Sequence, residues 1–298
     1  MGDYGHDLLF GTFVTPVNDP AGQAVEQAVV ADRAGLDLVT FQDHPYVAKF
    51  HDAWTLMSYA AGRTERVRLA LNVTNLPLRP PAVLARAVAS LDLLSGGRVE
   101  LGIGAGAFWD GVVAMGGPRR TPAESVQALE EAIAVIRGIW DVDTKRPLVV
   151  GGEHYRVEGA KRGPAPAHDV GIWVGAYKPR MLRLIGRHAD GWVPSVQYLT
   201  GGVADLGEMN EHIDAAAAQA GRPPGAIRRL LNIGGRFAAT GSGFLHGPPQ
   251  QWAEELADVA LTYGTSGFIL ASDDTATTER FAAEVAPAVR ALVSAARG

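Results

Sequence analysis

Short apolar runs alternate with longer segments in which apolar residues recur every three or four positions, and this pair of patterns repeats along nearly the whole chain. A short apolar run followed by an amphipathic helix is typical of a parallel βα unit. Eight such units most economically close into a single (β/α)8 barrel, and a doubly wound open sheet is the alternative. The runs that we expect to form strands are, in chain order, Leu8–Phe13, Leu36–Phe41, Val67–Val73, Val99–Ile103, Ile172–Gly175, Trp192–Val196, Leu230–Phe237 and Phe268–Ala271.

The helices between these runs carry recognisable start and stop signals. Asp19 and Pro20 are expected to open the first helix, and Gly35 to follow its end. Thr121 and Glu124 form a capping box before the fourth helix. Two prolines open the third helix, whose apolar residues share one face that we expect to be buried: Val83, Leu84, Ala87, Val88, Leu91 and Leu94.

Residues 141–169 interrupt this alternation. They lack a helical pattern, but the apolar residues around Gly151 and Gly152 indicate a hairpin, and a proline-rich stretch follows. We therefore expect an insertion between the fourth helix and the fifth strand. No linker or internal repeat divides the sequence, so residues 1–298 are expected to form one barrel domain that carries this insertion.

The composition is that of a globular protein without a polyanionic partner. Hydrophobic residues make up 47% and charged residues 20% of the 298 residues, which is enough to fill a sizeable core. The net charge of -5, with no run of like charges, argues against binding to nucleic acid or an anionic membrane. The sequence has no cysteine, no signal-peptide pattern and no apolar run long enough for a bilayer, so we expect a cytoplasmic protein.

In a (β/α)8 barrel the active site is built from the strand ends and the loops that follow them. Asp43 and His44 follow the second strand, with Tyr46 just beyond, and a histidine at such a place can exchange a proton near neutral pH. The alternative is an ordinary loop histidine bonded to the backbone. A metal site with His51 and Asp52 is less favoured, because the spacings match no zinc motif.

The segment Gly175–Arg180 follows the fifth strand and suits phosphate binding. Its small residues Gly175 and Ala176 allow backbone amides to approach an anion, and the helix that follows would present free N–H groups. Lys178 can add positive charge, although a lysine at a helix start can equally be a solvated surface group.

Gly104 and Gly106 follow the fourth strand. A dinucleotide-binding turn is disfavoured there, because no third glycine stands at the required spacing and Phe108 and Trp109 would obstruct a pyrophosphate. We expect the glycines to allow close approach of the backbone to a flat ring. The two aromatic residues either form an apolar pocket wall or pack under the insertion.

Three stretches are more specific: residues 36–46 (LDLVTFQDHPY), residues 76–106 (LPLRPPAVLARAVASLDLLSGGRVELGIGAG) and residues 173–192 (WVGAYKPRMLRLIGRHADGW). Through them, from Phe10 to Val289, the sequence resembles the luciferase-like monooxygenase superfamily, whose barrels use reduced FMN or the deazaflavin coenzyme F420. The resemblance implies a barrel with an insertion after the fourth helix, a cofactor ring over the strand ends and usually a homodimer.

The resemblance also implies roles for residues at the mouth of the barrel. It places Asp43 and His44 at the cofactor ring, with the histidine in proton transfer or substrate positioning, and Thr74 beside the ring. The segment Leu71–Val73, which includes Asn72, falls where many members carry a bulge with a non-proline cis peptide behind the ring. The loop whose backbone holds the cofactor phosphate matches Gly175, Ala176 and Tyr177.

Departures from the family pattern bear on the substrate. Deazaflavin-dependent sugar-phosphate dehydrogenases have a glutamate where this sequence has Ala107 and an asparagine where it has Asp110, which argues against that activity. Phe108 and Trp109, together with Tyr46 and Asp110, instead mark the expected pocket for a small and fairly apolar organic substrate.

Three functions follow as hypotheses. The first is a monooxygenase in which reduced FMN, supplied by a separate reductase, reacts with oxygen in a pocket that excludes water. The second is an F420-dependent oxidoreductase that transfers a hydride without oxygen, with His44 serving the proton. The third is a flavin-binding protein without turnover.

Overall fold

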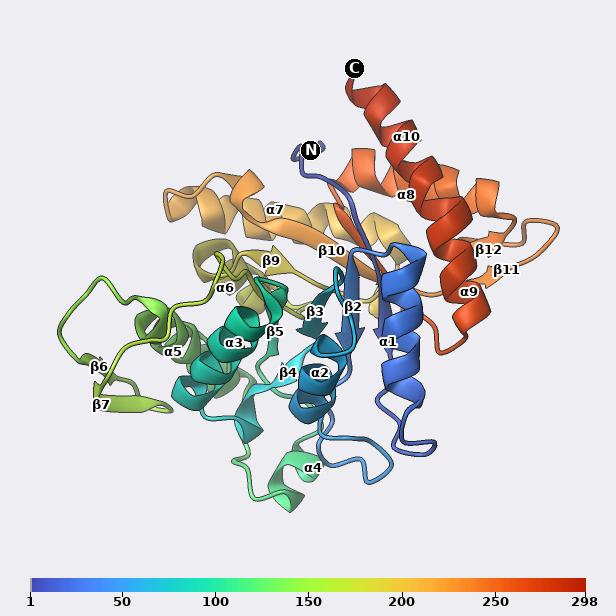
Figure 1. Ribbon diagram of the computed structural model, residues 1–298. Coiled ribbons are helices and arrows are strands. Elements are labelled where there is room, and N and C mark those ends of the chain that lie inside the picture. Colours follow the sequence, from blue (N-terminus) through green and yellow to red (C-terminus); the bar gives the residue numbers. More distant parts are fainter. Residues whose placement is uncertain (1) are drawn as a thin grey trace.

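A computed structural model describes residues 2–298, and its main feature is a closed ring of parallel strands (Figure 1). Every neighbouring pair in the ring is parallel, and pairing of β3 with β5 closes it. The predicted (β/α)8 barrel is confirmed, and the open sheet is excluded. The ring consists of β1 Leu9–Val14, β2 Leu38–Phe41, β3 Arg68–Leu71, β4 Thr74–Asn75, β5 Val99–Gly104, β8 Ile172–Val174, β9 Gly191–Trp192, β10 Arg228–Ile233 and β13 Gly267–Ala271.

Helices surround this ring on the outside (Figure 1). Their apolar faces pack against strands that are buried on both sides, as expected for parallel strands covered by crossover helices. In chain order the helices are α1 Gln23–Ala34, α2 Ala53–Ala61, α3 Pro81–Ser95, α4 Trp109–Ala114, α5 Pro122–Trp140, α6 Pro179–His188, α7 Asp205–Gln219, α8 Pro249–Tyr263, α9 Thr275–Arg280 and α10 Ala286–Arg297. Of these, the short α4 stands apart from the barrel wall (Figure 1). None of the helices in residues 2–298 is both long and apolar enough to cross a bilayer.

Several element boundaries differ from those expected. The first helix begins at Gln23 rather than at Asp19, because Pro20 forms a turn in which its carbonyl oxygen accepts a hydrogen bond from the Gln23 N–H at 3.1 Å. The sixth strand ends at Trp192 and the seventh at Ile233, and the apolar residues beyond them belong to irregular segments. The capping box at Thr121 and the left-handed residue at Gly35 are both confirmed.

The third strand, expected as one run over Val67–Val73, is divided into β3 and β4. The two pieces are separated by Asn72 and Val73, which are joined by a non-proline cis peptide, as the family resemblance implies. The neighbouring strand β5 has glycine at this level: a Cβ atom on Gly102 would lie 1.9 Å from the Leu71 carbonyl oxygen, and one on Gly104 would lie 2.6 Å from the Val73 side chain. These two glycines therefore make room for the divided strand.

Helix α3 has two apolar faces rather than one. Leu84 and Val88 are buried against the barrel as expected, but Val83 is 65% exposed and Leu94 is 85% exposed. The prediction that Val83, Ala87 and Leu94 lie on the buried face is wrong, because all three are exposed on a second apolar stripe of the same helix. The second stripe, together with Tyr59 of α2, faces outward from the barrel wall.

The insertion forms the expected hairpin, in which β6 Leu148–Gly151 pairs antiparallel with β7 Arg156–Ala160. Its turn is held by the Glu131 carboxylate of α5, which accepts the backbone N–H groups of Glu153, His154 and Tyr155 at 2.8 to 3.0 Å. The Tyr155 hydroxyl donates to the Leu76 carbonyl oxygen at 3.2 Å. The hairpin is therefore fixed both to α5 and to the segment that directly follows β4.

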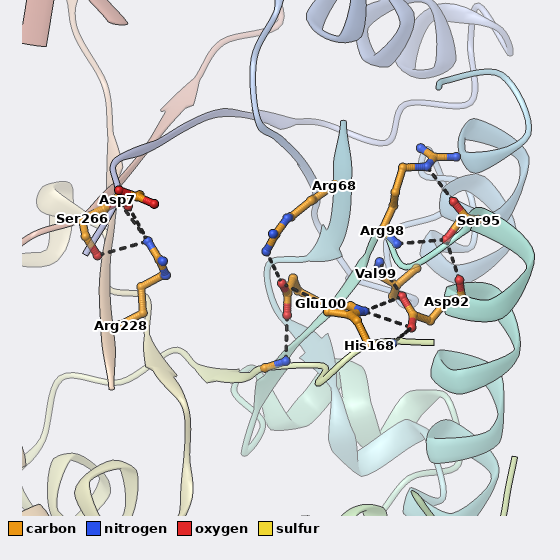
Figure 2. A network of polar contacts seen from close by, with 11 residues as sticks. Asp7, Arg68, Asp92, Ser95, Arg98, Val99, Glu100, His168, Arg228 and Ser266 are labelled. Atoms are coloured by element: carbon orange, nitrogen blue, oxygen red, sulfur yellow. Dashed lines mark hydrogen bonds and ion pairs between the residues drawn. The ribbon is translucent and has the colours of Figure 1, made fainter. Parts of the chain in front are cut away.

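A polar network closes the other end of the barrel, where the strands begin (Figure 2). The buried Asp92 carboxylate accepts hydrogen bonds from the backbone of Val99 and Ala167 and lies 3.0 Å from Nδ1 of His168. Glu100 accepts from Arg68 at 2.8 Å and from the Gly171 N–H at 2.7 Å. The Glu100 and Asp92 carboxylates raise the pKa of His168 to about 9. This network anchors the end of the insertion at the face of the barrel that serves stability.

Candidate active site

A cavity of about 260 Å³ opens at the C-terminal ends of the strands. It is lined by nine of the residues that the sequence places at the site: Asp43, His44, Tyr46, Asn72, Thr74, Gly104, Gly106, Gly175 and Tyr177. Phe13, Gln42, Ser195 and Asn232 also line it. The cavity therefore draws on the ends of every strand of the ring except β13, as in other barrels of this architecture.

Asp43 is held by a cation that the sequence analysis missed. Its buried carboxylate accepts from Nε and Nη2 of Arg79 at 3.0 and 3.1 Å and from the Asn75 N–H at 2.9 Å. Arg79 also donates to the exposed Asp52 at 2.7 Å. Burial opposes the charge on Arg79, but these bonds to Asp43 and Asp52 raise its pKa overall. The feature of the sequence that could have drawn attention to Arg79 is its position directly before Pro80 and Pro81.

His44 lies at the cavity wall with its ring stacked on Tyr46, the centroids being 5.4 Å apart. Within residues 2–298 its imidazole makes no hydrogen bond, so both ring nitrogens are available to a ligand. Burial lowers the pKa of His44, and the nearby Asp43 only partly opposes this effect. The imidazole is therefore neutral at pH 7 and can accept a proton.

A chain of side-chain hydrogen bonds crosses the cavity. Asn72 Nδ2 donates to Asn232 Oδ1 at 2.6 Å, and Asn232 Nδ2 donates to Ser195 Oγ at 3.0 Å. Asn72 follows β3 and Asn232 lies in β10, four strands away around the ring in either direction. Asn232 was missed because it stands inside an apolar strand, although a polar residue at such a place is itself a signal.

Two buried polar atoms in the cavity wall have no hydrogen-bond partner in the described chain. They are the Thr74 hydroxyl oxygen and the Asn75 side-chain oxygen. Buried polar groups are almost always hydrogen-bonded, so unpaired ones in residues that line a cavity indicate the position of a ligand. Val73 also lines the cavity and provides an apolar surface there.

In the loop after β8, only two of the four residues expected to bind the cofactor line the cavity. Gly175 and Tyr177 line the cavity, and the Tyr177 hydroxyl accepts the Ser195 N–H at 2.8 Å. Ala176 is buried outside the cavity and its carbonyl oxygen accepts from the Trp192 indole at 2.9 Å. Lys178 is exposed at the N-terminus of α6.

Three residues expected in the substrate pocket lie outside the cavity lining. Trp109 packs beside Gly106, the ring of the exposed Phe108 contacts Tyr46 in a tilted arrangement with the centroids 5.1 Å apart, and the exposed Asp110 is paired with Arg119. Phe108 has a positive φ of 48° and precedes α4, a short helix that the sequence pattern did not reveal. These residues belong to the rim, and the inner wall is more polar than expected.

Comparison with known proteins agrees with this geometry. The family model of the luciferase-like monooxygenases matches residues 8–240, which is most of the chain. The chain belongs to this family. Its resemblance to flavin- or deazaflavin-dependent oxidoreductases, inferred from the three sequence stretches, is thereby confirmed.

Curated relatives carry names from this class. A phthiodiolone/phenolphthiodiolone dimycocerosates ketoreductase of Mycobacterium kansasii is 38% identical over 192 residues, or 61% of this chain and 48% of the relative. An F420-dependent glucose-6-phosphate dehydrogenase of Nocardia farcinica is 32% identical over 223 residues, or 71% of this chain and 63% of the relative. The chain thus spans about half the length of the ketoreductases it matches.

Solved structures share the fold. An F420-dependent secondary alcohol dehydrogenase in complex with an F420–acetone adduct superimposes with a TM-score of 0.82 at 20% identity, covering 95% of this chain and 99% of that one. An EDTA monooxygenase from Chelativorans sp. BNC1 superimposes with a TM-score of 0.78 at 16% identity, covering 96% and 94%. The two expected cofactors, FMN and F420, are both found by name among such relatives and neighbours.

Proposed function

We propose that this enzyme is a deazaflavin-dependent oxidoreductase that interconverts a small hydroxyl compound and its carbonyl form without using oxygen. The observation that carries the proposal is His44, a neutral imidazole with no partner in the described chain, set in a cavity wall that also bears Gln42, Ser195 and Asn232. Such a wall suits a substrate with a hydroxyl or carbonyl group. A pocket that protects a flavin peroxide would instead need to exclude water.

The cavity has the features that a flat, hydrogen-bonding ring requires. Val73 would offer an apolar surface to the cofactor, and the unpaired oxygens of Thr74 and Asn75 would be free to accept hydrogen bonds from the cofactor or the substrate. Gly175 and Tyr177 would border the phosphate-bearing side chain of the cofactor, next to the N-terminus of α6. When bound, coenzyme F420 takes up a hydride from the substrate carbon or returns one to it.

In this scheme, residues of the chain would accept the proton of the substrate hydroxyl and return it in the reverse reaction. In alcohol oxidation an imidazole nitrogen of His44 accepts the hydroxyl proton, and in carbonyl reduction the protonated imidazole returns it. Asp43 takes no proton in this scheme, because Arg79 and the Asn75 N–H occupy its carboxylate. Asp43 instead positions the loop that carries His44, and its charge favours the imidazolium when that forms.

The proposal is tested by offering oxidised F420 and a panel of secondary alcohols, with and without oxygen, and following the absorbance of F420. Reduction of F420 at equal rates in air and under argon is the expected result. Oxygen consumption with reduced FMN and no turnover with F420 would instead establish the monooxygenase. In the carbonyl-reducing direction the enzyme would need reduced F420 from a separate reductase.

We also propose that the enzyme is a homodimer joined through the outer faces of α2 and α3. A hollow of about 600 Å³ between these helices is lined by apolar and small residues, including Trp54, Ala87 and Ser90. Tyr59, Val83 and Leu94 stand exposed around it. A contiguous apolar patch on two helices marks an interaction surface, and a second copy can bury the same patch on both subunits.

A further inference from the structure

Three aromatic rings lead from the proposed proton acceptor to the surface of the molecule. His44 stacks on Tyr46 with the ring centroids 5.4 Å apart, and both residues line the cavity. Tyr46 in turn contacts Phe108, whose ring centroid is 5.1 Å away. Phe108 lies outside the cavity lining and is 64% exposed. The rings therefore mark a continuous path from His44 to the rim, where the protruding helix α4 begins (Figure 1).

The chain adopts an unfavourable conformation to present Phe108 at this rim. Its φ of 48° lies in the left-handed region, which bulky residues rarely adopt, and its exposed ring gains little from packing. Strained residues of this kind cluster at ligand sites. Gly111 makes room for the arrangement, because a Cβ atom there would lie 2.6 Å from the Phe108 ring and 2.7 Å from the Tyr46 ring. The local backbone is therefore built to hold these two rings at the mouth of the cavity.

The cavity offers no positive charge to a substrate. The residues that line it within the described chain include no lysine or arginine, and the lowered pKa of His44 leaves its imidazole neutral at pH 7. The Asp43 carboxylate is already paired with Arg79. An anionic group would lose its hydration in this cavity without gaining a charged partner, which is unfavourable. The site therefore suits an uncharged substrate.

The size of the cavity leaves room for only the reacting end of such a substrate. Its volume of about 260 Å³ would have to hold the cofactor ring as well, whereas pockets for small organic ligands alone have about 300 to 1,000 Å³. Atoms beyond the reacting carbon would therefore extend out of the cavity. The wall next to His44 continues as the rings of Tyr46 and Phe108, so these rings are the surface that such atoms would meet.

We propose that Tyr46 and Phe108 form a subsite for the uncharged, apolar part of the substrate, an alkyl chain or aryl ring on the carbon that bears the hydroxyl or carbonyl group. The inference rests on the proposed function and narrows its substrates to neutral secondary alcohols and ketones with several carbon atoms on one side. An apolar group at this subsite would bury the exposed face of Phe108, and burial of apolar surface favours binding.

Ligand binding tests the subsite without turnover. Calorimetric titration in the presence of oxidised F420, which has no hydride to give, yields dissociation constants for 2-butanone, 2-hexanone and 2-octanone. Affinity should rise about 2- to 4-fold for each added methylene group. The anion 7-oxooctanoate, which has as many carbon atoms as 2-octanone, should bind more weakly than 2-octanone.

Phe108→Gly removes the ring while glycine adopts the positive φ without strain, so the fold should be retained. This variant should bind 2-octanone about 5- to 10-fold more weakly than the wild type and show a weaker dependence on chain length. Met115→Ala removes an exposed apolar side chain at the other end of α4. It is the matched control and should keep the wild-type dependence.

Equal affinity of the wild type for the three ketones, or the same dependence on chain length in F108G as in the wild type, would overturn the subsite. Oxidation of short and long secondary alcohols by F420 with equal kcat/KM would also overturn it and would leave the hydride-transfer function standing. Binding that strengthens with chain length, without reduction of F420 by any alcohol, would support the subsite and overturn the proposed function.

Discussion

Asn72 and Asn232 join opposite sides of the barrel through a side-chain hydrogen bond of 2.6 Å at the base of the cavity. Both residues line the cavity, so this hydrogen bond lies where a ligand would enter the barrel. Through Asn72 it also fixes the position of Val73, which lines the cavity between Asn72 and Thr74.

Replacing Asn232 with alanine should therefore affect both stability and cofactor binding. The half-buried Asn72 amide loses its Asn232 partner, which costs about 1 kcal/mol of unfolding free energy. Urea denaturation and a cofactor titration measure the two effects. Ser195→Ala, which removes only the far end of the same chain of bonds, is the matched control and should cost less in both. Equal effects of the two variants would show that the contact with Asn72 has no special importance.

Replacing Arg79 with glutamine should destabilise the protein by about 3 kcal/mol, because the buried Asp43 carboxylate loses its counter-ion. Chemical denaturation at pH 7 measures this change. Asp52→Asn is the control, because it removes the exposed partner of Arg79 while asparagine still caps α2. A loss in D52N as large as that in R79Q would place the important contact at Asp52 instead.

The rate of alcohol oxidation should depend on His44 in its neutral form. Burial lowers the pKa of His44, so the rate should be constant above neutral pH and fall only as the pH drops through this depressed pKa. His44→Ala should lower the rate constant by about 10²- to 10⁴-fold with little change in cofactor affinity. Single-turnover measurements of F420 reduction across pH separate the two quantities. A pH profile that is the same in H44A and wild type would remove His44 from proton transfer.

His168 should make stability depend on pH in the opposite range. Its pKa is raised to about 9 in the folded protein, against about 6.5 for an unperturbed histidine. The stabilisation is therefore fully present below about pH 6.5 and is lost as the pH rises through 9. Allowing for solvent screening, we expect H168N to cost about 1 kcal/mol at pH 6 and much less at pH 10. His212→Asn, which removes an imidazole 3.9 Å from the exposed Glu208, is the control for loss of a histidine as such.

Replacing Leu94 with glutamate should convert the proposed dimer into a monomer, because a charge would then lie on the apolar α2–α3 surface. Light scattering coupled to gel filtration gives the mass directly. Val149→Glu places the same charge on an exposed valine of the hairpin and should leave the mass unchanged. A monomeric wild-type protein would refute the dimer.

The sequence predicted the fold correctly wherever a periodic apolar pattern corresponded to a single buried face. Eight apolar runs separated by amphipathic helices led to the barrel, and the capping box at Thr121 was recognised because its hydrogen bonds are local. Helix α3 was misjudged because two apolar stripes give the same spacing as one broad stripe, and only the packing shows which of them faces the barrel. The exposure of Val83 and Leu94 could not be read from periodicity.

The candidate site was predicted where residues stand next to one another in the sequence and was missed where the fold brings them together. Asp43 and His44 follow a strand directly, so their place at the mouth was expected. Arg79 reaches Asp43 from 36 positions away, and Asn232 meets Asn72 from 160 positions away. Such contacts depend on barrel closure, which no local pattern encodes.

The hairpin's attachment through Tyr155 also bears on how the insertion can be exchanged. Its strands can accept substitutions at exposed positions such as Val149 without contact with the cavity. Tyr155 differs, because its hydroxyl holds the Leu76 carbonyl two residues from Thr74. A hairpin grafted from a relative would therefore preserve the pocket only if it supplies a donor at that one point. A single phenol thus separates the part of the insertion that can be redesigned freely from the part that belongs to the active site.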